Sequence, residues 1–170
     1  MIFRNKFETS EKGSNMLKDV LIEFLTKGPA HLSYKQILRQ IDPAKCHRRI
    51  AGAHTIWEEL EHVRIAQEDI IQFMLDPNWK SPPWPEGYWP APDMSPDDDR
   101  WQFSVEGFMG DLNQMVDLIR TGEIDLHAEI PHAPDYTYIR EILLVIDHNA
   151  YHLGKIMQLN KMQVGETQTG

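Results

Sequence analysis

Two histidines stand four residues apart near the end of the chain. His148 and His152 lie within residues 139–159, a segment rich in Ile, Leu, Val and Met. Side chains four residues apart project from the same face of a helix, so two imidazoles can bind one metal ion. His62, in a second helical segment, can supply a third nitrogen. The spacing predicts a metal site built from two helices.

The periodicity of the apolar residues predicts an all-α fold, because residues of this type recur every three or four positions and strand-like alternation is not convincing. A short helix is expected after Ser33, which forms a capping box with Gln36. Four helices with apolar stripes fit a four-helix bundle in a single domain, residues 16–163, between polar tails at 1–15 and 164–170. The long helices are expected at about residues 15–27, 55–75, 95–121 and 137–162.

A long connection separates the second and third of these helices. Residues 78–99 contain six prolines and three tryptophans. Connections of this length are uncommon in compact domains unless they are functional or disordered, and this one is too aromatic for disorder. We expect a rigid crossover with buried tryptophans, or a cover over the site. Ser95 and Pro96 are expected to begin the third helix.

A helical wheel places the histidines at the border between packing and polar surfaces. The expected buried stripe of the last helix includes Ile146 and Ala150. His148 and His152 fall at the far edge of the polar arc, where apolar residues flank them, so the pair borders both solvent and packing surface. His62 occupies a similar border on the second helix. His54 precedes the capping Thr55, so we expect it to cap or pack rather than to bind a metal. Ligands in a cleft between helices need such border positions.

Composition narrows the classes of function. The net charge is −9, with 26 acidic and 17 basic residues, which disfavours a nucleic-acid partner. Cys46 is the single cysteine, which excludes an intramolecular disulfide and indicates a reducing cytoplasm. No apolar run is long enough for a membrane span. The sequence contains no motif for nucleotide binding or for a serine nucleophile. A di-iron bundle needs a Glu-x-x-His motif on two helices, and the last helix has none to match Glu59–His62, which disfavours a di-iron site.

Three segments resemble the DinB-like (DinB/YfiT) family: residues 54–67, 88–90 and 147–154. The most specific is Asp-His-Asn-Ala-Tyr-His-Leu-Gly at 147–154. The resemblance covers residues 17–162 and implies a four-helix bundle with a long crossover after the second helix. It also implies one divalent metal ion, most often zinc or nickel, bound by three histidines that match His62, His148 and His152.

Three neutral imidazoles leave coordination positions open for water or substrate. A divalent ion would lower the pKa of a water or thiol that it binds. Since characterised relatives include transferases and isomerases that use low-molecular-weight thiols, we expect a thiol or water to attack a small electrophile, in a transferase-like or hydrolase-like reaction. Glu58 and Glu59 are candidates for a general base or for orienting the ligands. Tyr151 and Trp89 are candidates for substrate contact.

An alternative function is non-catalytic. The bundle can serve as a metal-stabilised stress-response or binding module, in which the histidines contribute only stability. The last helix is apolar around much of its circumference, which favours a homodimer. The expected partners are therefore a small-molecule substrate and a second copy of the chain, without nucleic acid or membrane.

Overall fold

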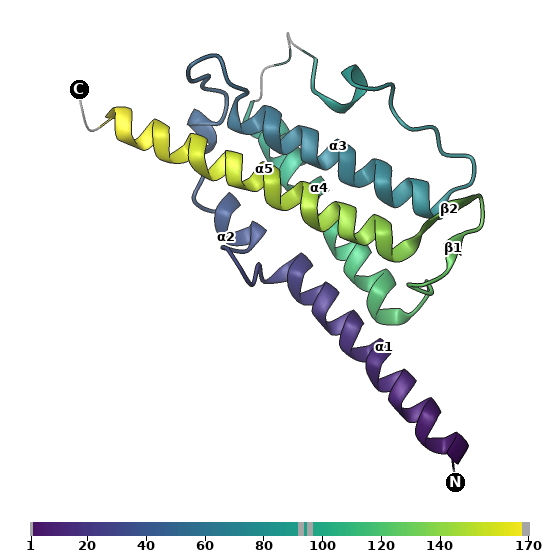
Figure 1. Cartoon of the computed structure of the whole chain (residues 1–170). Coiled ribbons are helices and arrows are strands. Elements are labelled where there is room, and N and C mark those ends of the chain that lie inside the picture. Colours follow the sequence, from purple (N-terminus) through teal and green to yellow (C-terminus); the bar gives the residue numbers. More distant parts are fainter. Residues whose placement is uncertain (1, 92–93, 95–96, 168–170) are drawn as a thin grey trace.

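The computed structural model describes residues 2–91, 94 and 97–167 (Figure 1). Most of this part is helical, which confirms the expected all-α fold. The strands of a small antiparallel hairpin, which the sequence analysis did not predict, join the last two helices. The elements are α1 (Ile2–Thr26), α2 (Tyr34–Leu38), α3 (Ile56–Leu75), α4 (Asp98–Thr121), β1 (Glu129–Ile130), β2 (Ala133–Thr137) and α5 (Tyr138–Thr167), with 3-10 turns at Pro43–Lys45 and Glu86–Tyr88.

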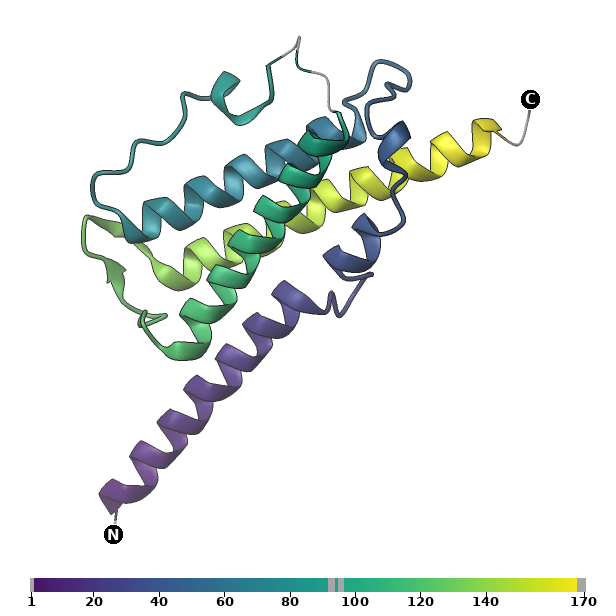
Figure 2. The ribbon, with the colours of Figure 1, turned by 180° about the vertical axis from the view of Figure 1, so that it is seen from behind.

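Helices α1, α3, α4 and α5 form the bundle. Helix α3 packs against α4 and α5, and α1 packs against the same two helices from the other side. Helices α3 and α4 run in the same direction, whereas α1 and α5 run in the opposite one (Figures 1 and 2). Parallel neighbours need a connection that returns along the whole of α3, which is about 30 Å long. The segment between α3 and α4 makes this return, so the predicted crossover is confirmed.

Local sequence signals set several helix ends. The capping box of Thr55 and Glu58 begins α3, with hydrogen bonds of 3.1 and 2.7 Å. Gly122 ends α4 in the left-handed conformation, at φ 76°, as expected for a glycine after the last turn. The cap of α4 is Asp97, whose side chain accepts from the Arg100 amide at 2.9 Å. Ser95 and Pro96, which were expected to begin this helix, lie outside the described residues.

Two helices are longer than expected. Helix α1 begins at Ile2 rather than near residue 15, and α5 continues to Thr167 rather than ending near residue 162. Neither extension contains a proline, and most residues in both tolerate a helical backbone. The segments expected as tails are therefore largely helical, and the domain limits of 16 and 163 stay a prediction. In the described part of the chain, no helix is both long and apolar enough to cross a membrane.

The rotation of α5 differs from the expected one. Its buried side chains recur at alternating intervals of three and four, whereas Ile146 and Ala150 are only partly buried. Asn149 is 1% exposed and belongs to the buried row. His152 also lies within this row rather than at the border of a polar arc. The row comprises Ile142, Val145, Asn149, His152, Ile156, Leu159 and Gln163.

Polar side chains in the core connect three helices close to the histidines. The Gln67 amide on α3 donates to the Phe108 carbonyl on α4 at 2.8 Å. The Asn149 amide on α5 donates to the Gln67 side-chain oxygen at 2.7 Å. Buried amides that bond in this way fix how the helices face one another, because any other rotation leaves them unpaired. Asn149 adjoins His148, so this network also fixes the rotation at which α5 presents its histidines.

Candidate metal centre

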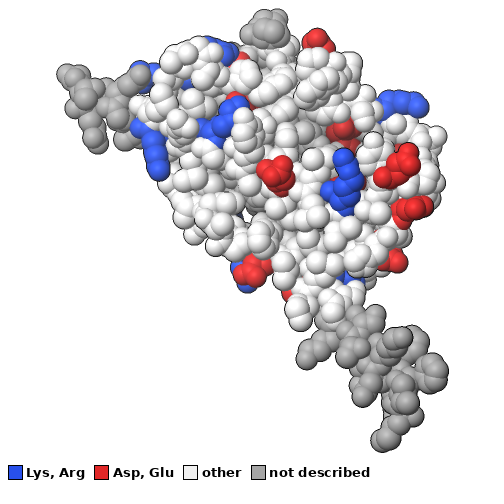
Figure 3. Space-filling model, in the orientation of Figure 1, with Lys and Arg blue, Asp and Glu red and all other residues white. Residues whose placement is uncertain are grey.

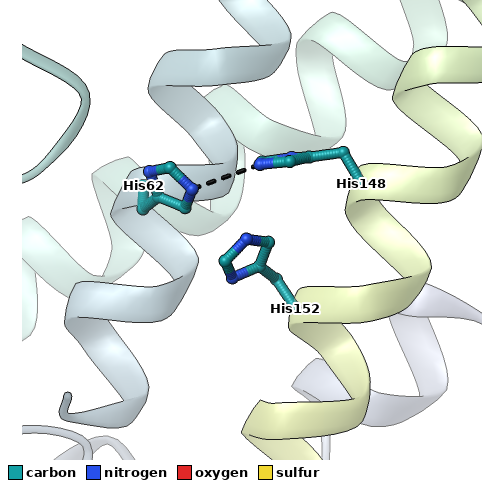
Figure 4. A group of neighbouring side chains, drawn as sticks. All are labelled: His62, His148 and His152. Atoms are coloured by element: carbon teal, nitrogen blue, oxygen red, sulfur yellow. Dashed lines mark hydrogen bonds between the residues drawn. The ribbon is translucent and has the colours of Figure 1, made fainter. Parts of the chain in front are cut away.

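Three imidazole rings from α3 and α5 converge on one point (Figure 4). One ring nitrogen each of His62, His148 and His152 lies within 4.8 Å of the other two. The Nε2 atoms of His62 and His148 are 3.2 Å apart. Two nitrogens that bind zinc at about 2.0–2.1 Å with tetrahedral angles are about 3.3 Å apart. The predicted convergence is confirmed, and the spacing suits two ligands of a single ion.

The crossover orients the ring of His62. Its Nδ1–H donates to the Tyr88 carbonyl at 2.7 Å, and a carbonyl only accepts, so the proton resides on Nδ1. Trp89 stacks on the same ring with a centroid separation of 4.0 Å and an interplanar angle of 5°. The lone pair of Nε2 is therefore directed toward the other two histidines. A metal ligand is usually fixed in this way, through its second nitrogen.

A buried carboxylate orients His152. The Nδ1–H of His152 donates to Glu59 Oε2 at 2.6 Å. The other oxygen of Glu59 accepts from Lys155 Nζ at 2.5 Å and lies 3.1 Å from Nδ1 of His54. A carboxylate behind a histidine is common at zinc sites, where it fixes the ring and makes it a better donor. His54 therefore contacts this carboxylate and stands outside the group of three ligands.

His148 is held differently from the other two. Its Nε2 faces His62, and its Nδ1 is buried without a hydrogen-bond partner among the described residues. Burial, together with the neighbouring His152 and His62, lowers the pKa of His148 to about 4. Burial also lowers the pKa of His62, although its hydrogen bond to Tyr88 opposes the change. Both rings are neutral at pH 7, which is the form that binds metals.

The structure separates the two candidate glutamates. Burial by itself raises the pKa of Glu59, but hydrogen bonds from His152 and Lys155 outweigh it and lower that pKa to about 2. A carboxylate engaged in this way is a weak base and suits the orienting role. Glu58 accepts from the Thr55 amide and pairs with Arg49, so it serves as the helix cap. The role of either residue as a general base stays a prediction.

The two aromatic candidates lie on different sides of the cluster. Trp89 covers His62 and approaches His54 with a ring separation of 4.0 Å. Tyr151 is 65% exposed, and its ring meets that of His152 edge to face at 4.9 Å. The expectation of buried tryptophans in the crossover is wrong: Trp84 is 76% exposed, and Trp79 and Trp89 are only partly buried. The crossover is therefore a partial cover over His62, and substrate contact by Trp89 and Tyr151 stays a prediction.

A cleft of about 500 Å³ is lined by Glu59 and Lys155 but by none of the three clustered histidines. Ile50, Leu159 and Met162 contribute apolar walls. This volume is in the range of small-molecule sites. Glu59 stands between the cleft and His152, so the cleft adjoins the cluster through the carboxylate that orients one of its ligands.

Sequence reasoning missed two parts of this site. Lys155 follows His152 by three residues, so helical spacing alone brings the two side chains to one face. That spacing was a usable signal for Lys155. The carbonyl of Tyr88 gave no signal, because any residue has one and only the path of the crossover places it against His62.

A family model described as the DinB superfamily matches residues 33–156, which is more than half of the chain and includes all three histidines. No curated protein matches the chain. No solved structure matches it either.

Proposed function

Since this chain belongs to the DinB superfamily, we propose that His62, His148 and His152 bind one divalent metal ion. The observation that carries this proposal is the convergence of three imidazoles, two of which bond through Nδ1 to fixed acceptors and direct Nε2 inward. Neutral imidazoles are good ligands for zinc and nickel, the two ions that we propose. An all-nitrogen site of this kind does not favour calcium or magnesium, which prefer oxygen.

The proposed activity is the attack of a thiol or water on a small electrophile. When bound, the ion lowers the pKa of a thiol or water ligand toward neutrality and so provides a nucleophile at pH 7. Three protein ligands leave a coordination position for that molecule. The residues of the chain hold the ligands in place: Tyr88 fixes His62, Glu59 fixes His152, and Trp89 covers the ring of His62.

The cleft beside Glu59 is the proposed place for the electrophile or for the body of a low-molecular-weight thiol. Its apolar walls at Ile50 and Leu159 accept carbon chains, and Lys155 contributes an ammonium group to its lining. A transferase-like reaction uses the thiol as the nucleophile, and a hydrolase-like reaction uses water. Thiol consumption with an electrophilic test substrate, measured with and without added zinc, distinguishes these two reactions.

A specific observation also supports the non-catalytic alternative. The three ligands come from α3 and α5, so an ion would link two helices of the bundle and stabilise it. In a metal-stabilised binding module, removal of the ion lowers the melting temperature while no substrate ever binds. Metal-dependent thiol consumption excludes this alternative.

A homodimer is the proposed assembly. Met16, Val20 and Phe24 lie four residues apart on one face of α1 and are 60%, 42% and 44% exposed. Leu143 on α5 is 50% exposed. Figure 3 shows Lys, Arg, Asp and Glu side chains on one face of the molecule, with uncharged residues between them. Light scattering gives the mass in solution, and a monomeric mass at micromolar concentration contradicts the dimer. A cytoplasmic location stays a prediction that the single cysteine suggested.

The metal site is tested by replacing one ligand and counting bound ions. His148→Ala is the best variant, because Nδ1 of His148 has no hydrogen-bond partner among the described residues and its Nε2 contacts only another proposed ligand, His62, so its loss disturbs the fold least. His127→Ala, at an exposed position outside the cluster, is the control. We expect elemental analysis to find about one ion per chain in the wild type and the control, and a large loss in His148→Ala. Equal stoichiometry in all three refutes the site.

A further inference from the structure

A buried carboxylate on α3 holds the crossover in place. Asp69 follows His62 by seven residues, two turns along the same helix, and is 8% exposed. Its Oδ1 accepts from the Trp79 indole N–H at 2.7 Å, and its Oδ2 accepts from the Tyr88 hydroxyl at 2.6 Å. The two oxygens thus bind two points of the crossover, one just after α3 and one beside the metal centre.

Tyr88 connects this carboxylate to His62. Its hydroxyl donates to Asp69, and its backbone carbonyl accepts from Nδ1 of His62 at 2.7 Å. The next residue, Trp89, stacks on the same imidazole. Both features that orient His62 therefore belong to a dipeptide that Asp69 anchors.

The crossover is compact where it approaches this anchor. A Cβ on Gly87 would lie 2.7 Å from Cβ of Pro82 and from Cδ of Pro83, so the chain folds closely on itself just before Tyr88. The Pro83 carbonyl also accepts from the Gly87 amide at 2.7 Å. A displacement at the Tyr88 hydroxyl is therefore passed to its carbonyl and to Trp89 instead of being absorbed by a loose turn.

We propose that Asp69 is a positioning residue of the metal centre. It anchors Tyr88, and Tyr88 keeps the proton of His62 on Nδ1 and the ring in its plane, so that Nε2 is presented to the ion. This inference rests on the proposed metal site, although its effect on the tautomer of His62 does not need an ion. Asp69 itself touches neither the ion nor the substrate.

Two variants test this anchor and a third controls for stability. Tyr88→Phe removes only the hydroxyl, and Asp69→Asn keeps the shape of the side chain but replaces an acceptor oxygen with a donor. Trp79→Phe removes the other hydrogen bond of Asp69 while Tyr88 remains anchored. Urea unfolding gives the stability loss of each variant, and the loss in Trp79→Phe shows how much comes from Asp69 contacts that do not involve Tyr88.

Zinc affinity is measured by competition with a chromophoric chelator, and ligand geometry by the visible spectrum of the cobalt-substituted protein. We expect Asp69→Asn and Tyr88→Phe to weaken zinc binding by about 10-fold, the lower end of what outer partners of metal ligands contribute. Their losses should not add in the double variant, because both act through Tyr88. Trp79→Phe should stay within about two-fold of the wild type, since its hydrogen bond does not involve Tyr88. Unchanged affinity and cobalt spectra in Asp69→Asn and Tyr88→Phe overturn the inference.

The tautomer of His62 provides a readout that needs no metal. In the metal-free wild type, nitrogen NMR should show the proton of His62 on Nδ1, and both variants should show a mixture. A wild-type tautomer in the variants overturns the role of Asp69 whether or not zinc binds. A wild-type protein with the expected tautomer that takes up no ion refutes the proposed function instead, so the two failures are distinguishable.

Discussion

Exchange of two adjacent glutamates for glutamine separates ligand orientation from helix capping. Glu59 accepts from His152 and Lys155, whereas Glu58 caps α3 and pairs with Arg49. Both substitutions remove one negative charge and preserve the size of the side chain. We expect Glu59→Gln to weaken zinc binding and Glu58→Gln to leave it nearly unchanged.

The magnitude follows from the electrostatics of Glu59. Its pKa lies at about 2 instead of 4.5, a difference that corresponds to about 3 kcal/mol in favour of the carboxylate. Glu59 is 1% exposed, so solvent screens this energy little. His152 and Lys155 are the partners that hold the carboxylate in this form, and removal of the carboxylate behind a metal-binding histidine costs about 10-fold in metal affinity. Loss of the Glu58 cap should cost about 1 kcal/mol of stability without this effect.

The assay is zinc competition with a chromophoric chelator at pH 7.5, with urea unfolding in parallel. Lys155→Met is a further control, because it removes the other partner of Glu59 and leaves His152 bound to the carboxylate. We expect a loss of about 10-fold in Glu59→Gln only. Equal zinc affinity in Glu59→Gln and Glu58→Gln would refute the orienting role of Glu59.

Three further outcomes concern the whole protein. In the metal-free state, His148 takes up a proton near pH 6.5 in the unfolded chain but only near pH 4 in the folded chain. The free energy of unfolding should therefore fall by up to about 3 kcal/mol as the pH drops from 6.5 to 4. Urea unfolding of the wild type and of His148→Ala checks this, and an equal pH dependence of the two proteins contradicts it. Zinc at about 100 times its dissociation constant should raise the stability of the wild type by about 2.7 kcal/mol and leave His62→Ala unaffected, as calorimetry can show. Gly122→Ala should cost about 1 kcal/mol in urea unfolding, because φ is 76° there, and a wild-type unfolding midpoint would contradict the strain.

Features that depend on neighbouring residues were predictable from the sequence. Thr55 and Glu58 form their capping box within four residues, and Gly122 ends α4 through its own backbone freedom. The same holds for His148 and His152, whose common face follows from helical spacing. These signals gave the helices and the ligand pair without knowledge of the tertiary structure.

Features that depend on distant partners were not predictable in the same way. Asn149 is buried because Gln67, on another helix, accepts its hydrogen bond, and a wheel weighted by hydrophobicity assigns it to the surface. The alternating intervals of three and four from Ile142 to Gln163 carry the correct rotation of α5 once polar residues are allowed in the row. The adjacent residues Glu58 and Glu59 likewise diverge by about 100° on α3, and only their partners show which one faces the site.

The three ligands are prepared to different degrees. His62 and His152 already carry their protons on Nδ1, held by the Tyr88 carbonyl and by Glu59. The Nε2 of His62 therefore accepts in its contact with His148, so His148 must donate from its own Nε2, the atom that would bind an ion. Metal binding thus requires the proton of His148 to move to Nδ1. Two ligands need no rearrangement, and the cost of ordering the centre falls on His148, whose Nδ1 has no partner among the described residues.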